Sequence, residues 1–393
     1  MELTPSYIKP LYYSNAPVIN PQRWKDAVRA FDNGDYMESL RALLDYINPA
    51  LLKGKALHQP FELVYPHGST VVNLSLDKDI FRIKASFLRL PDKHKVPLMR
   101  KAAEQNFYPL TLTQIRYHEE DGGVLCFEYQ THLNLTQPNK IHAVIKEACI
   151  YADEMDDEYI KRYGATRFRK PIITPLDEAD LDKAVRRLKK ALADAFRYIR
   201  YFEAKRWDSY LFDTIINTLY CIVDQVYVNG VLRTSIEKQI RFLRFDKDTA
   251  FQDKLGYGVR FLKKLDATPV EDIQKDLYLI TKLINTKYRP SHKMILTRLQ
   301  GEAHKIAADF EEKNFINAFY QLRFLFQDLL YTYNLDTSLW HKLTDALSQA
   351  AGVPWEQGAT ILRQSFEDFL AEEENQRNTE KSKKKGFFAR LFS

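Results

Sequence analysis

Alternating apolar and polar residues between positions 61 and 133 predict short β-strands. Apolar side chains occupy every second position, as at Val72, Leu74 and Leu76, and turn-forming residues separate the runs. Strands are expected over residues 61–65, 72–76, 80–90, 112–119 and 124–133. Apolar residues at helical spacing predict a helix pair over 21–48 and helices over 92–107 and 138–163. This order predicts an α+β domain over residues 21–165, in which helices flank an antiparallel sheet.

From residue 177 onward the alternation stops, and apolar residues recur only at helical spacing. Residues 177–374 are therefore predicted to form an all-α region, with Pro290 as the expected seam if it comprises two domains. Helices are expected over residues 177–205, 207–228, 233–245, 250–265, 269–286, 291–311, 314–333, 337–351 and 355–374. Residues 166–176 are expected to form a linker. Residues 1–20 are expected to form an extended leader, because Pro5, Pro10 and Pro17 disfavour a helix there.

Two distant segments share a pattern that is typical of tetratricopeptide-like helix hairpins. In the first, Phe31, a polar turn, Tyr36 and Ser39 follow one another, and in the second Phe310, a charged turn, Phe315 and Ala318 stand at the same offsets. A small residue at the last position lets two helices approach closely. Because two copies this far apart do not make an array, we interpret them as convergent helix hairpins.

The composition is that of a globular protein with a sizeable core. Hydrophobic residues make up 45% of the 393 residues and aromatic residues 13%. A core of this size can stabilise the fold without disulfide bonds or bound metal ions. Cys126, Cys149 and Cys221 lie in apolar stretches and match no zinc pattern, so buried free thiols in a reducing compartment are expected. Without a recognisable secretion signal or a membrane-spanning apolar run, the sequence favours a cytoplasmic protein.

No catalytic motif or nucleotide-binding loop is found in the sequence, so we expect neither an enzyme nor a cofactor. A group of possible metal ligands falls within 32 residues: His118, Cys126, His132, His142 and Cys149. No pair of them has the short spacing of a zinc site. We therefore favour buried thiols and surface imidazoles over a metal site.

Charge is concentrated in two helical segments. Residues 183–206 carry nine basic and two acidic residues among aromatic ones, and the net charge of the whole chain is +6. An amphipathic helix with a basic outer face is the favoured interpretation, and a phosphate- or base-binding surface is the alternative. The candidate contacts on this face are Lys183, Arg186, Arg187, Lys190 and Arg197. Residues 153–158 are acidic, and we expect them to form a solvated helix face, with a basic partner surface as the second interpretation.

Residues 375–393 are expected to form a disordered, basic and amphipathic tail. Its candidate contact residues are Lys383, Lys384, Lys385, Phe387, Phe388, Arg390 and Phe392. Three interpretations stay open: binding to an anionic membrane surface, docking into a groove of a partner, and packing against the protein's own helices. The first would place the protein at the inner face of a membrane.

Residues 61–163 resemble a known family. The resemblance rests on the strand FRIKASFLRLP, the helix LMRKAAEQNFYP, the hairpin strand LCFEYQTHL and the closing helix IYADEMDDEYIKRYG. This segment is similar to the YbjN-type domain, which shares the fold of type III secretion chaperones. The resemblance implies a bacterial, chaperone-like binding fold that holds an extended partner segment, often as a homodimer. It implies no side-chain site, and it does not extend to the helical half.

These observations together favour a non-enzymatic protein-binding or adaptor protein. Another protein is the expected partner, recognised through the α+β domain and the helical surfaces, and chaperone-like behaviour is one form this could take. The alternative is a peripheral membrane or nucleic-acid-associated protein that uses the basic face of residues 183–206 or the tail. Of these two anionic partners, nucleic acid is the less favoured.

Overall fold

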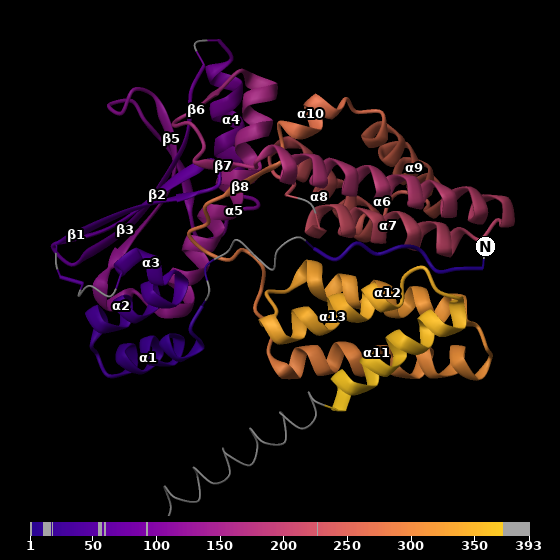
Figure 1. The fold of residues 1–393 in the computed structure, drawn as a ribbon. Helices are drawn as coiled ribbons and strands as arrows, with labels where there is room; N and C mark the ends of the chain where they lie inside the picture. The colour runs from indigo at the N-terminus through magenta and orange to yellow at the C-terminus, as the bar shows by residue number, and fades with distance from the viewer. Residues whose placement is uncertain are drawn as a thin grey trace, which may run out of the picture. The chain divides into compact units, whose positions relative to one another are not determined.

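The computed structural model describes the chain except residues 1, 11–16, 18, 54–56, 59, 92, 226 and 372–393. The described residues divide into two compact units (Figure 1). Among the described residues, the α+β unit draws on those between 17 and 175 and on 278–286, and the helical unit on residues 2–10, on those between 176 and 277, and on 287–371. The predicted fold class is therefore confirmed: an antiparallel sheet with flanking helices precedes a predominantly helical region.

The α+β unit is built on an antiparallel sheet with the strand order β1-β2-β3-β5-β4. The strands are β1 Phe61–His67, β2 Thr70–Asp77, β3 Ile80–Arg89, β4 Gln114–His118 and β5 Val124–His132, at the places where the alternation predicts them. Val72, Leu74 and Leu76 point to one face and are completely buried. The opposite face carries polar residues such as Asn73 and Lys84, because successive side chains of a strand alternate between faces.

Helices cover the apolar face of this sheet. The long helix α5, Pro138–Tyr163, packs on β2, β3 and β5, and α4, Lys95–Gln105, packs on α5 and β4. The helix pair α1, Pro21–Asp32, and α2, Tyr36–Ile47, also packs on α5, and a short α3, Pro49–Leu52, follows it. The core of the unit lies between these helices and the sheet.

The structure differs from the sequence prediction around residues 166–176 and 269–286. The expected linker contains β6, Thr166–Arg167, which pairs with β3, and β7, Ile173–Pro175. The expected helix over 269–286 is instead a short α10, Val270–Gln274, followed by the strand β8, Tyr278–Ile280, which pairs with β7. Residues 278–286 thus return to the α+β unit, where Leu283 and Ile284 are buried in its core. Local periodicity cannot reveal this segment, because its partners lie more than a hundred positions away in the chain.

The acidic residues at 153–158 also differ from the solvated face that was expected. Asp156 is 2% exposed, and its carboxylate lies 2.9 Å from Arg167 Nε, while the carboxylate of Asp157 lies 2.5 Å from Arg167 Nη2. Burial alone would lower the pKa of Arg167, but the two carboxylates raise it above its ordinary value. Asp156 and Asp157 therefore tie β6 to α5.

The helical unit consists of α6 Glu178–Lys205, α7 Asp208–Gln225, α8 Gly230–Phe245, α9 Phe251–Asp266, α10, α11 His292–Glu311, α12 Phe315–Thr332, α13 Thr337–Gln349 and a last helix described over residues 355–371. Its core is continuous from α6 to this last helix. Helix α7 is central, since it packs on α6, α8, α9 and α12. A Cβ on Gly258 would lie 2.9 Å from Ile215, so the absence of a side chain there lets α9 approach α7.

Both segments with the hairpin pattern form helix hairpins with matching turns. The rings of Phe31 and Tyr36 lie 5.4 Å apart in α1–α2, and those of Phe310 and Phe315 lie 5.7 Å apart in α11–α12, each pair in an edge arrangement. The small residue is fully buried in both hairpins, as Ser39 and Ala318. The two hairpins belong to different units, so they form no repeat array.

Candidate functional site

The basic residues predicted on residues 183–206 lie along helix α6, whose apolar side is buried in the helical core. Lys183, Arg186 and Lys190 are exposed on its outer side. The aromatic residues Tyr198 and Phe202 are fully buried and unavailable for stacking on bases. The helix is therefore amphipathic with a basic outer face.

The two remaining candidates on α6 have partners inside the unit. Arg197 lies 2.8 Å from the carboxylate of Asp194, and Arg187 donates a hydrogen bond to the main-chain oxygen of Lys9. Burial lowers the pKa of Arg187. The tail candidates, Lys383, Lys384, Lys385, Phe387, Phe388, Arg390 and Phe392, lie outside the described residues.

The hydrogen bond from Arg187 points to a feature that the sequence analysis missed, namely a channel filled by the start of the chain. Residues 2–10 run extended between the α6–α7 pair and the α12–α13 pair (Figure 1). Leu3 forms an isolated antiparallel bridge with Pro354, just before the last helix. We call residues 3–9 the leader segment. The parts of α6, α12, α13 and the loop before the last helix that contact this segment form the leader channel.

Helix side chains and loop carbonyls satisfy the main chain of the leader segment. Tyr198 donates its hydroxyl to the Leu3 oxygen at 2.7 Å, and the Thr4 nitrogen donates to the Val353 oxygen at 2.8 Å. The buried guanidinium of Arg323, on α12, donates to the main-chain oxygens of Pro5 and Ser6 at 3.2 and 3.0 Å. Because Arg323 is only 5% exposed, these two carbonyls replace the water that its charge would otherwise bind.

Two leader side chains are also recognised. Asp194, on α6, accepts hydrogen bonds from the nitrogen and the hydroxyl of Ser6 at 2.8 and 2.9 Å. The hydroxyl of Thr4 donates to the Ala350 oxygen at 2.8 Å, and Thr4 is 1% exposed. A Cβ on Gly358 would lie 2.8 Å from the Thr4 methyl and 2.9 Å from the Ala350 oxygen, so a residue without a side chain is needed for this close approach. The channel therefore selects a short polar side chain at positions 4 and 6.

Further along the leader segment, Lys9 forms an ion pair with Asp345 of α13 at 2.5 Å. The sequence analysis predicted an extended leader over residues 1–20, and the described residues 2–10 contain no helix (Figure 1). It found neither the channel nor the contacts of Asp194 and Arg323, because charged residues of an amphipathic helix are expected on its solvent-exposed face. A buried arginine at an otherwise apolar helical position is the one local signal that could have drawn attention to α12.

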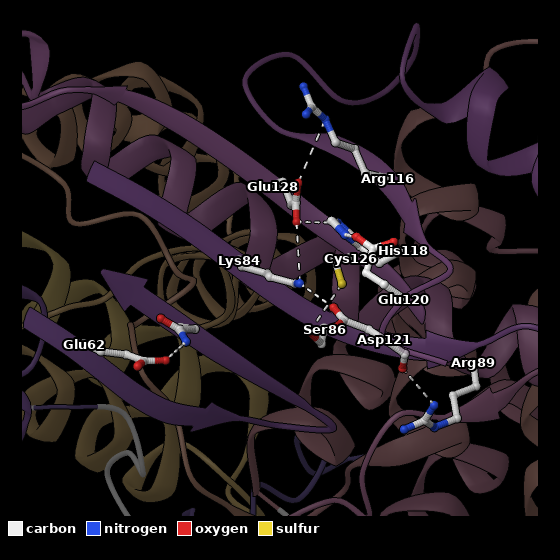
Figure 2. Close-up of polar contacts among 11 residues, drawn as sticks. Glu62, Lys84, Ser86, Arg89, Arg116, His118, Glu120, Asp121, Cys126 and Glu128 are labelled. Atoms are coloured by element: carbon white, nitrogen blue, oxygen red, sulfur yellow. Dashed lines mark hydrogen bonds and ion pairs between the residues drawn. The ribbon is translucent and has the colours of Figure 1, made fainter. Parts of the chain in front are cut away.

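Apart from the leader channel, a cluster of polar side chains lies on the solvent-facing side of the sheet (Figure 2). Lys84 on β3 lies 2.7 Å from Asp121 and 4.0 Å from Glu128 on β5. Burial alone would lower the pKa of Lys84, but the hydrogen bond with Asp121 and the neighbouring charges raise it above its ordinary value. A cleft of about 570 Å³ adjoins the cluster and is lined by Lys84, Arg116 and Glu128, among other polar residues.

Three side chains of this cluster converge from β4 and β5. His118 Nε2 lies 2.6 Å from Glu128 Oε1, and the Cys126 sulfur lies beside this pair on the same face of the sheet (Figure 2). Nε2 is buried and makes no hydrogen bond within the described part of the chain. Cys126 is fully buried and lies 3.3 Å from the Ser86 hydroxyl. Burial raises the pKa of the Cys126 thiol to about 11, although Ser86 and Lys84 act in the opposite direction.

No protein-family model matches the chain, and comparisons with curated proteins and with solved structures gave no match. Functional inference therefore rests on the leader channel, the polar cluster of the sheet and the basic face of α6. Among the residues that the structure describes, no helix combines the length and the apolar character needed to cross a bilayer.

Proposed function

We propose that this protein is a non-enzymatic protein-binding or adaptor protein whose helical unit takes up an extended segment of another protein in the leader channel. The observation that carries this proposal is the mode of binding of residues 3–9. Their main-chain oxygens and nitrogens are met one after another by Tyr198, Arg323 and Asp194. Recognition of an extended main chain with small side-chain pockets is a recurring mode of peptide binding.

The partner segment expected for this channel is extended and resembles Thr-Pro-Ser. Thr4 and Ser6 supply hydroxyl donors to Ala350 and Asp194, and Pro5 between them has no amide hydrogen that would need an acceptor. The leader segment then acts as an internal occupant that a partner displaces.

Peptide exchange tests this proposal. A chain that lacks residues 2–10 should bind a labelled synthetic peptide of residues 1–13, as measured by fluorescence anisotropy. The peptide change Ser6→Ala, which removes a hydrogen bond to the Asp194 carboxylate, should weaken binding about 10-fold or more. The peptide change Leu3→Ala should have little effect, because the Leu3 side chain is 46% exposed.

The controls keep folding and recognition apart. Because these substitutions are made in the peptide, they cannot unfold the receptor. If the shortened chain fails to fold, a protease site introduced between residues 10 and 20 of the intact chain allows cleavage after folding. The proposal then expects the cut segment to stay bound until excess peptide displaces it. Proteins captured by the shortened chain should be released by this peptide and not by a scrambled one, and failure of both exchange and release would refute the proposal.

Association with an anionic surface is the second candidate function, favoured by the exposure of Lys183, Arg186 and Lys190 along one helix. Replacing all three with Gln should reduce sedimentation with anionic vesicles and weaken its salt dependence. Nucleic acid is distinguished by salt-sensitive retention of an oligonucleotide. Replacement of the exposed pair Arg363 and Glu367 serves as a charge-neutral control on the same unit.

A further inference from the structure

The three converging side chains of the sheet have the composition of a metal site. One atom each from His118, Cys126 and Glu128 lies within 4.8 Å of the other two. Zinc binds imidazole, thiolate and carboxylate ligands at about 2.0 to 2.3 Å, which places tetrahedral ligands roughly 3.3 to 3.7 Å apart. The 2.6 Å between His118 and Glu128 is shorter than this spacing, and the other two distances stay within 4.8 Å. Tetrahedral binding therefore requires the His118 and Glu128 side chains to separate by about 0.7 Å.

The groups around these three residues are those that support metal ligands. The Nδ1 atom of His118 lies 3.3 Å from the Glu120 carboxylate, which leaves Nε2 to face Cys126 and Glu128. A carboxylate on the far nitrogen of a histidine fixes the ring and its tautomer in many metal sites. The second oxygen of Glu128 lies 4.0 Å from Arg116, and the thiol of Cys126 lies 3.3 Å from the Ser86 hydroxyl.

The local charge also accommodates a divalent cation. Lys84 is a cation that could compete for Glu128. It pairs with Asp121 at 2.7 Å and lies farther from Glu128, at 4.0 Å. With the imidazole neutral, three cations and three carboxylates give the cluster a net charge of zero, the members being Lys84, Arg89, Arg116, Glu120, Asp121 and Glu128. A divalent ion that displaces the thiol proton raises this charge by only one unit.

We propose that His118, Cys126 and Glu128 form a three-ligand site for Zn²⁺, with the fourth position open toward solvent. His118 and Glu128 are each about one-fifth exposed, and Glu128 also lines the cleft, so solvent reaches this side of the cluster. Three protein ligands and one exchangeable position are typical of zinc sites that bind a further molecule. The sequence analysis favoured no metal, because the ligands come from two strands and only the sheet brings them together.

Metal titration of the full chain tests the site. The reduced protein should bind one equivalent of Co²⁺ with a thiolate-to-cobalt charge-transfer band, and Zn²⁺ should abolish this band by displacement. X-ray absorption of the zinc-loaded protein should show one sulfur at about 2.3 Å and lighter ligands at about 2.0 to 2.2 Å. The change Glu120→Gln should weaken zinc binding about 10- to 100-fold, and Cys126→Ser should remove the cobalt band.

The matched control is His132→Gln, which alters an exposed histidine of β5 outside the cluster and should leave zinc affinity unchanged. A cobalt complex without the sulfur band, or a zinc affinity that is the same in Cys126→Ser as in the original protein, would overturn the proposal. If Cys126→Ser does not fold, the sulfur signal in X-ray absorption of the unaltered chain decides the question. Neither measurement depends on the leader channel, so this inference stands apart from the proposed function.

Discussion

The change Asp328→Ala should destabilise the helical unit by about 1.5–3 kcal/mol, because it removes a buried carboxylate that pairs with two partly exposed arginines. Asp328, on α12, is 5% exposed and lies 2.7 Å from Arg244 of α8 and 3.3 Å from Arg298 of α11. The Tyr220 hydroxyl of α7 donates to the same carboxylate at 3.3 Å. One side chain therefore joins four helices, and chemical unfolding followed by far-ultraviolet circular dichroism measures its loss.

Two comparison variants separate this effect from surface electrostatics. The change Glu367→Ala removes a half-exposed i,i+4 pair with Arg363 in the same unit and should cost only about 0.3–0.5 kcal/mol. The triple change Arg244→Met, Arg298→Met and Asp328→Leu should recover much of the loss, because apolar side chains then replace the carboxylate together with both arginines that it binds, and no charge is left without a partner. A cost below about 1 kcal/mol for Asp328→Ala would show that this carboxylate is not buried with its partners in solution.

Acidification from pH 7 to pH 4 should lower the free energy of unfolding of the α+β unit by about 3 kcal/mol through His67 alone. His67 is 2% exposed, and its Nδ1 accepts a hydrogen bond from the Leu283 nitrogen at 3.1 Å. Burial, with a smaller effect from Lys282, lowers the pKa of His67 to about 3. Between pH 6.5 and 3 the unfolded chain binds a proton that the folded chain does not, so stability is present above this window and falls as pH falls through it.

The change His67→Asn should flatten this pH dependence, because the amide oxygen can accept the same hydrogen bond without titrating. His142, packed against Trp24 and Tyr46, also has a burial-lowered pKa, about 4, so part of the slope should remain. The control His132→Asn changes an exposed histidine and should leave the slope as it is. If the pH dependence of the unfolding free energy were the same in His67→Asn as in the original protein, the imidazole would not be buried. Residues 278–286 would then not be docked beside His67.

The local pattern of the sequence determined most of the secondary structure. Alternation at Val72, Leu74 and Leu76 predicted β2 and its buried face, and helical spacing predicted α5 and most helices of the second unit. Proline content predicted the extended leader, and matched aromatic offsets predicted the α1–α2 and α11–α12 hairpins. These features depend on residues within a few turns or strand positions of one another, so a short window of sequence contains their cause.

Tertiary structure alone decided which of these elements meet. It placed residues 3–9 against Asp194 and Arg323, which lie about 190 and 320 positions away, and it returned residues 278–286 to the α+β unit. It also paired Arg167 with acidic residues that looked solvated, and it joined His118, Cys126 and Glu128 across two strands. Each of these contacts depends on packing between distant segments. A buried charge or hydrogen-bonding group needs a partner, and tertiary packing determines which residues are close enough to be that partner.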